Sequence, residues 1–313
     1  MNLEIGPLQP NEVDAADRVF RLAFGTREGL PDPTSFDGDA ARIRTRYRAS
    51  NVLAVGARLG GELVGSNLGT NWGSFRWIGP LSVRPDLWDR GIAQGLFERT
   101  LASLDGGNAR HLALYTIPQS PKHVGLYHKF GFWPGFLTVI MQKLVTATHA
   151  ATSFETYDNL RGSEKAACLK SCSEVCTSIF EGLDLSGEIQ SVSVQGLGDT
   201  VLLLDKTRLV AFAVCHRGAG SEAGSNTVYV KFAAVRSGLS AGEAFQRLLS
   251  ASERYAASVG MKRVVAGVNT GRRDAYVRML QSGFRPFLQG VAMHRPDEPG
   301  YDRPDVYVID DLR

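Results

Sequence analysis

The chain has 313 residues, a net charge of +3, and apolar and charged shares of 43% and 21%, all typical of a soluble globular protein. This length favours two domains over a single hydrophobic core. No run approaches the roughly 18 apolar residues of a membrane span, and the scattered Lys and Arg argue against a basic nucleic-acid-binding face. The opening MNLEIGPLQPNE lacks the basic flank and apolar stretch of a signal peptide, so we expect a cytoplasmic protein without membrane or nucleic-acid partners.

Helix and strand patterns alternate along the first half of the chain. In chain order we expect a helix within 13–24, a hairpin over 51–70 turning at Gly60-Gly61, a strand over 75–83, a helix ending near 104, a strand from 111, and a helix that ends before Gly131-Phe132. The hairpin prediction rests on alternating apolar residues around a glycine pair. The helices rest on apolar residues spaced three and four apart.

The second half repeats this order. Strand, Gly-containing loop and helix recur over 228–256, after a hairpin over 199–217 that turns near Asp205–Thr207. The register is constant, because Val235 follows Val83 by 152 residues and Gly283 follows Gly131 by the same number.

Hairpins combined with strand–helix crossovers predict an α/β fold, in which a mixed, mostly antiparallel sheet is flanked by helices. We expect two tandem domains, over 1–145 and 155–313, joined by a small, polar linker over 146–154. The last residues, GYDRPDVYVIDDLR, read as a final strand on the second sheet, or as a segment that reaches the cleft between the copies.

Three of the four cysteines, Cys168, Cys172 and Cys176, repeat every fourth residue and so lie on one helical stripe. A metal or redox cluster is one interpretation, but zinc sites rarely draw three thiolates from one straight helix. The 152-residue shift places these cysteines on buried-looking positions of the first helix, so we predict a packing role and no metal.

The segment Leu87-Trp88-Asp89-Arg90-Gly91-Ile92-Ala93 connects a strand to a helix. Free backbone N–H groups and the positive end of the helix dipole meet at such a point, which favours an anion. Gly91 permits close approach of a ligand, and Arg90 adds a permanent cation. The same glycine would also suit an ordinary turn.

With Val83-Arg84-Pro85 before it, this loop resembles the signature of the GNAT superfamily, the GCN5-related N-acetyltransferases, in which Val-x-Pro precedes Gln/Arg-x-x-Gly-x-Gly/Ala at a helix start. The resemblance implies two tandem GNAT-like domains, acetyl-CoA as cosubstrate, a pyrophosphate held by backbone amides of residues 90–94, and a bulged strand 81–83 that pairs with the pantetheine arm. Trp88 replaces the usual Gln or Arg, which orders the loop, so a lower cofactor affinity is expected. The implied cofactor-binding residues are Leu81, Ser82, Val83, Trp88, Asp89, Arg90, Gly91, Ile92, Ala93, Gln94, Ser120 and Tyr127.

The family's second motif is Asn-x-x-Ala-x-x-Leu-Tyr-x-x-x-Gly-Phe, and residues 120–132 match its Leu-Tyr-x-x-x-Gly-Phe half, with Ser120 in place of the asparagine. The resemblance implies that Tyr127 is the catalytic general acid. A phenol with a pKa near 10 is protonated at neutral pH and can donate to a departing thiolate. A purely packing role for Tyr127 is the alternative.

The second copy departs from these motifs. Met279 stands 152 residues after Tyr127, and Met cannot donate a proton to sulfur. Its loop over 236–244 is one residue shorter and carries Glu243, whose charge opposes a phosphate. We therefore expect a non-catalytic second copy and one coenzyme A per chain; a degenerate cofactor site and a structural turn both remain open for the loop.

The general base and the acceptor are less well marked. His111, His123 and His128 are candidates for the base, and none of them stands out. We expect acceptor specificity to come from the segment 24–40 and from the opposite copy. Asp32, Asp37 and Asp39 make this segment acidic, which would suit a cationic amine, but a capped loop in which Asp37 or Asp39 starts the next helix is the simpler interpretation.

The leading hypothesis is an N-acetyltransferase in which a primary amine of a small molecule or peptide directly attacks acetyl-CoA. A non-catalytic acyl-CoA-binding or regulatory module is the second hypothesis. Other acceptors, such as an aminoglycoside or a protein amine, form a third. Monomer and homodimer both fit the sequence.

Overall fold

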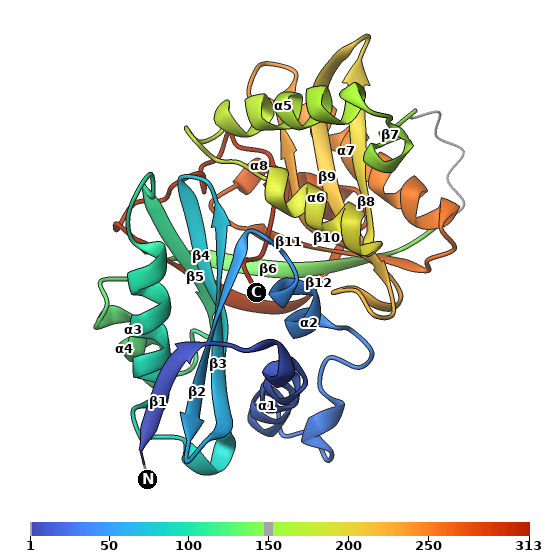
Figure 1. Cartoon of the computed structure of the whole chain (residues 1–313). Coiled ribbons are helices and arrows are strands. Elements are labelled where there is room, and N and C mark those ends of the chain that lie inside the picture. Colours follow the sequence, from blue (N-terminus) through green and yellow to red (C-terminus); the bar gives the residue numbers. More distant parts are fainter. Residues whose placement is uncertain (1, 147–152) are drawn as a thin grey trace.

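The computed structural model describes residues 2–146 and 153–313, and within them thirteen strands form one continuous sheet with helices on both faces (Figure 1). The strands are β1 (Leu3–Pro7), β2 (Val52–Leu59), β3 (Glu62–Trp72), β4 (Phe75–Val83), β5 (His111–Thr116), β6 (Trp133–Leu144), β7 (Glu155–Thr156), β8 (Gly198–Asp205), β9 (Arg208–Gly218), β10 (Gly224–Val235), β11 (Arg263–Asn269), β12 (Arg285–Arg295) and β13 (Val308–Ile309). The α-helices are α1 (Val13–Arg27), α2 (Arg42–Tyr47), α3 (Ile92–Leu104), α4 (Pro121–His128), α5 (Ser163–Thr177), α6 (Ser186–Gln195), α7 (Ala241–Ser258) and α8 (Arg273–Gln281). Short 3₁₀ turns, η1 to η4, cover Pro10–Glu12, Pro33–Ser35, Pro85–Leu87 and Tyr157–Asn159.

The predicted mixed, mostly antiparallel sheet is confirmed. Among the described strands, only β4 with β5 and β10 with β11 pair in parallel. Both predicted hairpins form: β2 and β3 turn at Gly60-Gly61, whose positive φ angles of 63° and 87° suit a tight turn, and β8 and β9 turn after Asp205.

The two copies exchange their last strands in the middle of the sheet. The order there is β5-β12-β6-β11, so β12 of the second copy pairs with β5 of the first, while β6 of the first pairs with β11 of the second. The proposed division between 145 and 155 therefore separates the two sequence repeats, but the sheet itself is continuous across both repeats. The middle of the predicted linker, 147–152, lies outside the described residues.

A shared hydrophobic core joins the copies on one face. Trp72 and Trp77 of the first copy pack with Phe232 of the second, and the Trp72 and Phe232 ring centroids are 5.2 Å apart. Cys172 and Cys176 are buried in the same cluster, and burial raises the pKa of the Cys176 thiol. The predicted packing role of the cysteine stripe is confirmed for these two residues.

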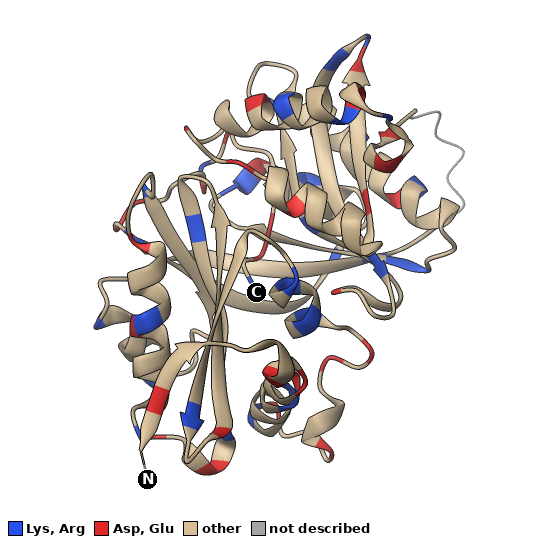
Figure 2. Cartoon of the chain, viewed as in Figure 1, with Lys and Arg blue, Asp and Glu red and all other residues tan. Residues whose placement is uncertain are grey.

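A buried ionic cluster also crosses between the copies. Arg46 of α2 contacts Glu222 at 2.5 Å, and Lys231 of β10 contacts Glu222 at 2.6 Å and Glu188 of α6 at 2.8 Å. Burial alone would raise the pKa of Glu222, but Arg46 and Lys231 outweigh it and hold that pKa well below its ordinary value. The other charges are spread over both halves in this view (Figure 2). None of the described helices is both long and apolar enough to cross a bilayer.

Candidate active site

Two cavities of similar size meet beside Tyr127. The first, of about 730 Å³, lies between the end of β4, the loop before α3, and α4; we call it the α3-side cavity. The second, of about 700 Å³, lies between α1, β4, β5 and β12; we call it the α1-side cavity. Among the described residues, the two cavities share Phe24, Arg27, Leu81, His123 and Tyr127, which we call the junction.

The cavities open where β4 and β5 separate. Their parallel pairing ends at Ile78 and Leu114, and the β3–β4 register shifts by one residue around Gly79, so β4 is bulged there. Beyond the bulge, β4 keeps its pairing with β3, while its other edge faces the α3-side cavity at Leu81–Val83. That edge offers backbone hydrogen-bonding groups to an extended ligand.

The loop that follows brings the backbone around to the first turn of α3. Gly91 has a φ of 79° and directly precedes the helix. No atom outside its chain neighbours lies within 4 Å of the position that a Cβ atom would occupy. The first N–H groups of the thirteen-residue α3 therefore adjoin open space, which suits an anion.

Trp88 orders this loop. Its indole N–H donates to the main-chain oxygen of Val83 at 2.8 Å, which fastens the loop to the end of β4. The indole therefore supplies a hydrogen bond of its own where Gln or Arg is usual, and the expected lower cofactor affinity stays a prediction. Asp89, with a φ of 67°, forms an ion pair with Lys122 of α4 across the cavity.

The structure brings most of the predicted cofactor residues together. The α3-side cavity is lined by Leu81, Ser82, Val83, Trp88, Asp89, Gly91, Ile92, Ala93, Gln94 and Tyr127. Arg90 and Ser120 are absent from this lining: Arg90 is exposed, and Ser120 caps α4 by accepting from the His123 N–H.

Tyr127 is the buried member of the junction. It is 7% exposed, and its ring packs on Phe97 with centroids 5.1 Å apart. Burial raises the pKa of Tyr127 to about 12, partly offset by Thr116 and Arg27. The phenol is therefore protonated at neutral pH and can donate a proton into either cavity.

The three candidate histidines lie in different environments. His123 is at the junction, one turn before Tyr127, and its Nδ1 is 2.5 Å from the Ser120 Oγ. His111 is buried against His294, with 2.9 Å between ring nitrogens, and His128 is exposed beside Trp133. Neither His111 nor His128 lines either cavity.

Aromatic rings form one wall of the α1-side cavity. Phe20 and Phe24 of α1 and Phe36 pack on one another, with ring centroids 4.9 to 5.6 Å apart. The opposite wall comes from the second copy, through residues 286–289 of the exchanged strand β12 and through Leu312 and Arg313. Both interpretations of the last residues are therefore confirmed in part: Val308–Ile309 form a final strand, β13, that pairs with β10, and Leu312 and Arg313 reach the cleft between the copies.

The acidic segment before α2 is structural. Asp32 accepts from the Thr34 N–H at 3.0 Å, Asp39 accepts from the Ser225 N–H at 2.8 Å, and Asp37 pairs with Arg42 at 3.1 Å. Burial opposes ionisation of Asp37, but Arg42 outweighs it and lowers the Asp37 pKa. The capping interpretation is confirmed for Asp32, which caps η2, but not for Asp37 or Asp39, because α2 begins at Arg42 with Ala41 as its N-cap.

The second copy has the same separation of strands, but the gap is filled. β10 and β11 stop pairing after Val230 and Ala266, which follow Ile78 and Leu114 by 152 residues. β13 then pairs antiparallel with β10 at Ala233 and Ala234, the counterparts of Leu81 and Ser82. The chain's own final strand thus occupies the edge that is open in the first copy.

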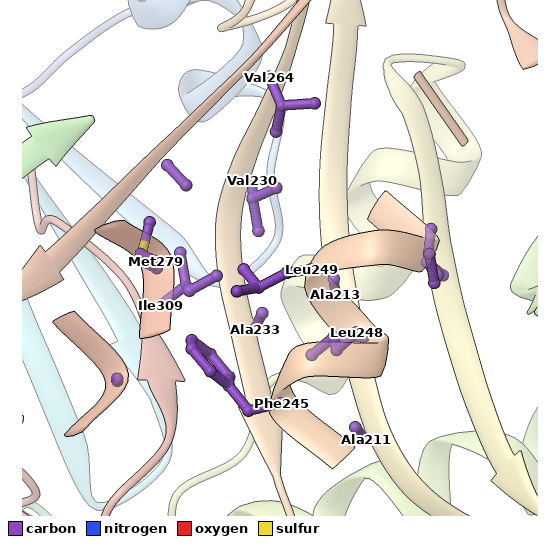
Figure 3. Close-up of a cluster of buried hydrophobic side chains, with 14 of the residues drawn as sticks. Ala211, Ala213, Val230, Ala233, Phe245, Leu248, Leu249, Val264, Met279 and Ile309 are labelled. Carbon is purple, nitrogen blue, oxygen red and sulfur yellow. The ribbon is translucent and has the colours of Figure 1, made fainter. Parts of the chain in front are cut away.

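Side chains complete this filling. Met279, the counterpart of Tyr127, is fully buried in one hydrophobic cluster with Ile309 and Phe245 (Figure 3). The Tyr307 ring packs on Phe245 at 5.4 Å between centroids, and the Arg278 guanidinium lies over Tyr307 at 5.8 Å. Arg278 also lies against Gly242, in the first turn of α7, where the first copy has open space.

Part of this lining agrees with the expectations from the sequence. Phe24 and Arg27 belong to the segment 24–40, and Leu312 and Arg313 belong to the tail that could reach the cleft. Residues 286–289 were not anticipated, and no local pattern marks them because their position depends on the exchange of β6 and β12.

The comparisons with known proteins agree with this architecture. Residues 18–132 match the acetyltransferase (GNAT) family. No curated protein matches the sequence. A Pyrococcus horikoshii structure is 14% identical over 97% of this chain and 93% of its own, with a TM-score of 0.68. A GCN5-related N-acetyltransferase from Sphaerobacter thermophilus is 13% identical over 94% and 95%, with a TM-score of 0.61.

A tandem GNAT protein from the clavulanic acid biosynthesis pathway is 16% identical over 94% of this chain and 98% of its own, with a TM-score of 0.56. At such identities these structures establish the shared fold. Because they span nearly the whole chain, they extend that fold beyond residues 18–132 to both copies.

Proposed function

We propose that the chain is a tandem GNAT enzyme that transfers an acetyl group from acetyl-CoA to a primary amine; the match of residues 18–132 to the acetyltransferase (GNAT) family and the shared tandem fold support the proposal. The observation that carries the proposal is the junction, where two cavities meet at a buried, protonated tyrosine. One cavity suits an extended anionic cofactor, and the other suits a separate acceptor.

The residues of the α3-side cavity fit coenzyme A. The first N–H groups of α3 and the left-handed Gly91 would hold the pyrophosphate, and the free edge of Leu81–Val83 would hold the pantetheine arm. Lys122 and Lys129 add positive charge at the rim. When bound, acetyl-CoA supplies an activated acyl group with sulfur as the leaving atom.

In the proposed reaction the amine enters the α1-side cavity and attacks the thioester carbonyl directly across the junction. Tyr127 acts as general acid, because its raised pKa keeps the hydroxyl protonated until a thiolate, a stronger base than water, develops beside it. The Phe97 ring packs on the phenol ring and restricts its orientation. The acceptor is proposed to be a small-molecule or peptide amine, and the setting the cytoplasm.

We assign this activity to the first copy, 1–145, and treat 155–313 as a non-catalytic copy. Two features support the assignment: Met279 has no proton to give, and β13 with Tyr307 and Arg278 fills the second cleft. The second copy would serve instead as a wall of the acceptor cavity.

The competing function is a non-catalytic acyl-CoA-binding module. It would keep the α3-side cavity and need no acceptor. The position of Tyr127 at the meeting point of two cavities favours the enzyme.

Calorimetric titration of acetyl-CoA, followed by thiol release across a panel of primary amines, separates these functions. We expect one acetyl-CoA per chain and turnover with at least one amine. Tight binding without turnover on any amine would favour the module, and two sites per chain would contradict the single active copy.

Tyr127→Phe tests the acid directly. We expect kcat to fall by about 100-fold or more, since general acid catalysis contributes that much, while acetyl-CoA affinity stays within about twofold of the wild type. An unchanged kcat would remove Tyr127 from the mechanism.

A further inference from the structure

We infer that the His123 imidazole is the general base that deprotonates the acceptor amine, and that Ser120 positions the ring. The inference rests on the proposed function and names a group that the family motif does not supply, because the motif has alanine at this position.

The first argument is location. Of the described residues that line both cavities, three can carry a proton: Arg27, His123 and Tyr127. Arg27 is always protonated, and Tyr127 is protonated far above neutral pH. His123 is the one member of the junction that can accept a proton near pH 7.

The carboxylates of the α1-side cavity are already engaged. Glu28 contacts Arg27 at 2.5 Å and is 46% exposed at the mouth, while both oxygens of Asp37 accept from Arg42. A carboxylate paired with a guanidinium is a weak base, so neither competes with His123.

The charges around His123 favour its neutral form. Burial lowers the pKa of His123, and Arg27 from α1 and Lys122 from its own helix lower it further. Of the other ionisable groups at this boundary, the Tyr127 hydroxyl is neutral and Asp89 is paired with Lys122. The imidazole is therefore unprotonated at neutral pH and available as a base.

Ser120 fixes the ring. Its Oγ lies 2.5 Å from the His123 Nδ1, and as the N-cap of α4 the same oxygen also accepts from the His123 main-chain N–H at 3.4 Å. When Nδ1–H donates to the Ser120 oxygen, Nε2 keeps its lone pair for an incoming proton. Ser120 is thus a positioning residue, and His123 the group that touches the substrate.

In the proposed step the acceptor amine arrives as R–NH₃⁺ and gives one proton to the His123 Nε2, leaving R–NH₂ and an imidazolium. The amine nitrogen forms a C–N bond to the thioester carbonyl as the C–S bond breaks, Tyr127 protonates the departing sulfur, and the second nitrogen proton restores the tyrosine. The products are an amide and free thiol, and His123 returns its proton to solvent.

The test compares kcat against pH for wild type, His123→Gln and the matched control His128→Gln, which changes an exposed histidine on the same helix. In the wild type and the control we expect kcat to decrease as the pH falls below 6.5 and to be constant above that pH, since the His123 pKa is lowered from 6.5. In His123→Gln the rate at pH 7 should fall at least 100-fold and rise with pH toward the pKa of the amine.

Trifluoroethylamine, which is already neutral at pH 7, needs no base. His123→Gln should therefore keep its rate on this amine within about threefold of wild type, a rescue that a structural defect would not give. Ser120→Ala should lower kcat for ordinary amines by about tenfold and leave the trifluoroethylamine rate unchanged. An unchanged pH profile in an active His123→Gln enzyme overturns the inference, whereas a wild type inactive on every amine overturns the proposed function itself.

The α1-side cavity carries a second, independent inference about the acceptor, which also rests on the proposed function. The geometry points to an amine whose body is apolar and uncharged. The Phe20, Phe24 and Phe36 rings form one continuous wall, and Phe287 and Leu288 of β12 face the cavity from the second copy.

The charged groups that line this cavity are already paired. Arg27 is paired with Glu28 at 2.5 Å, Arg42 with Asp37 at 3.1 Å, and Arg313 with Asp311 at 2.9 Å. A second charge on the acceptor would have to disrupt one of these pairs, which costs more than burying an apolar group of the same size.

Calorimetry on the complex with coenzyme A compares phenethylamine with phenylalanine, which adds a carboxylate to the same body, and with spermidine, a polycation. We expect phenethylamine to bind at least tenfold more tightly than either. Phe36→Ala should weaken the binding of phenethylamine by about tenfold. Phe136→Ala, a change at an exposed ring outside the cavity, should leave this affinity unchanged. Tighter binding of phenylalanine or spermidine than of phenethylamine overturns this inference. Because calorimetry measures binding without turnover, this outcome is distinguishable from a failure of the proposed catalysis.

Discussion

At the scale of single residues, Trp88 shows how a departure from a motif can preserve its effect. The indole N–H replaces a polar side chain by donating to the main-chain oxygen of Val83. The loop is therefore tied to the end of β4 by a hydrogen bond that the motif does not contain, and a motif mismatch is a poor guide to loop order here.

Trp88→Phe keeps an aromatic ring and removes the donor. Since a neutral hydrogen bond contributes about 1 kcal/mol, we expect the acetyl-CoA Kd to rise about fivefold. Calorimetry measures this directly. Trp133→Phe, at a residue that is 52% exposed and outside the α3-side cavity, should leave the Kd unchanged; equal effects of the two substitutions would contradict the role of Trp88.

At the scale of elements, the two strand–loop–helix units diverge in what occupies the gap beside them. Both pairs of parallel strands separate at equivalent positions. In the first copy the gap opens into the α3-side cavity, and in the second it contains β13. One repeated element thus borders an open cavity in one copy and a packed strand in the other.

Gly91→Ala tests which loop binds the cofactor. Alanine at a φ of 79° is strained by about 1–2 kcal/mol, and the strain falls on the first turn of α3. We expect acetyl-CoA affinity to fall about tenfold or more. The matched change Gly238→Ala, in the second loop at a φ of 150°, should lower thermal stability and leave the affinity unchanged; a comparable loss of affinity would indicate a second cofactor site.

At the scale of the whole molecule, the exchange of β6 and β12 makes the two copies interdependent. Each copy supplies a strand that pairs inside the other's half of the sheet, and the shared core and the Arg46–Glu222 pair lie across the same boundary. The α1-side cavity is itself composite, since both copies line it, so under the proposed function acceptor binding should depend on both copies.

Expression of 1–149 and 150–313 as separate chains tests this interdependence. Alone, each should aggregate, because the edges of β5 and β11 would be unpaired and the Trp72–Phe232 core exposed. Co-expression should restore a 1:1 complex on size-exclusion chromatography. A monomeric, cooperatively melting 1–149 would show that the exchange is dispensable.

Glu222→Gln should lower the free energy of unfolding by about 3–5 kcal/mol, because it leaves Arg46 and Lys231 buried without a full counter-charge. The folded pKa of Glu222 is depressed, so its contribution is present above the unfolded pKa of about 4.3 and is lost as the pH falls through the folded value. Denaturant unfolding of both proteins should therefore show a constant difference near pH 7 that shrinks below about pH 4. Glu181→Gln, at a side chain that is 75% exposed, is the control and should have little effect.

The sequence by itself determined the repeat, the strand and helix order, both hairpin turns and the strand–loop–helix segment that we propose binds an anion. These depend on local periodicity, on glycines that permit tight turns, and on helix termini, all of which act within a few residues. It also determined the contrast between Tyr127 and Met279, because a constant register of 152 residues aligns them.

Only the tertiary structure decided how the repeats are joined. Because β6 and β12 have the same sequence pattern, the local sequence does not indicate which of them pairs with β5 and which pairs with β11. For the same reason residues 286–289 were not predicted to line the cavity, whereas the sequence did allow the last residues to reach it. His123 could not be separated from His111 and His128 until packing buried His111, left His128 exposed and placed His123 beside Tyr127.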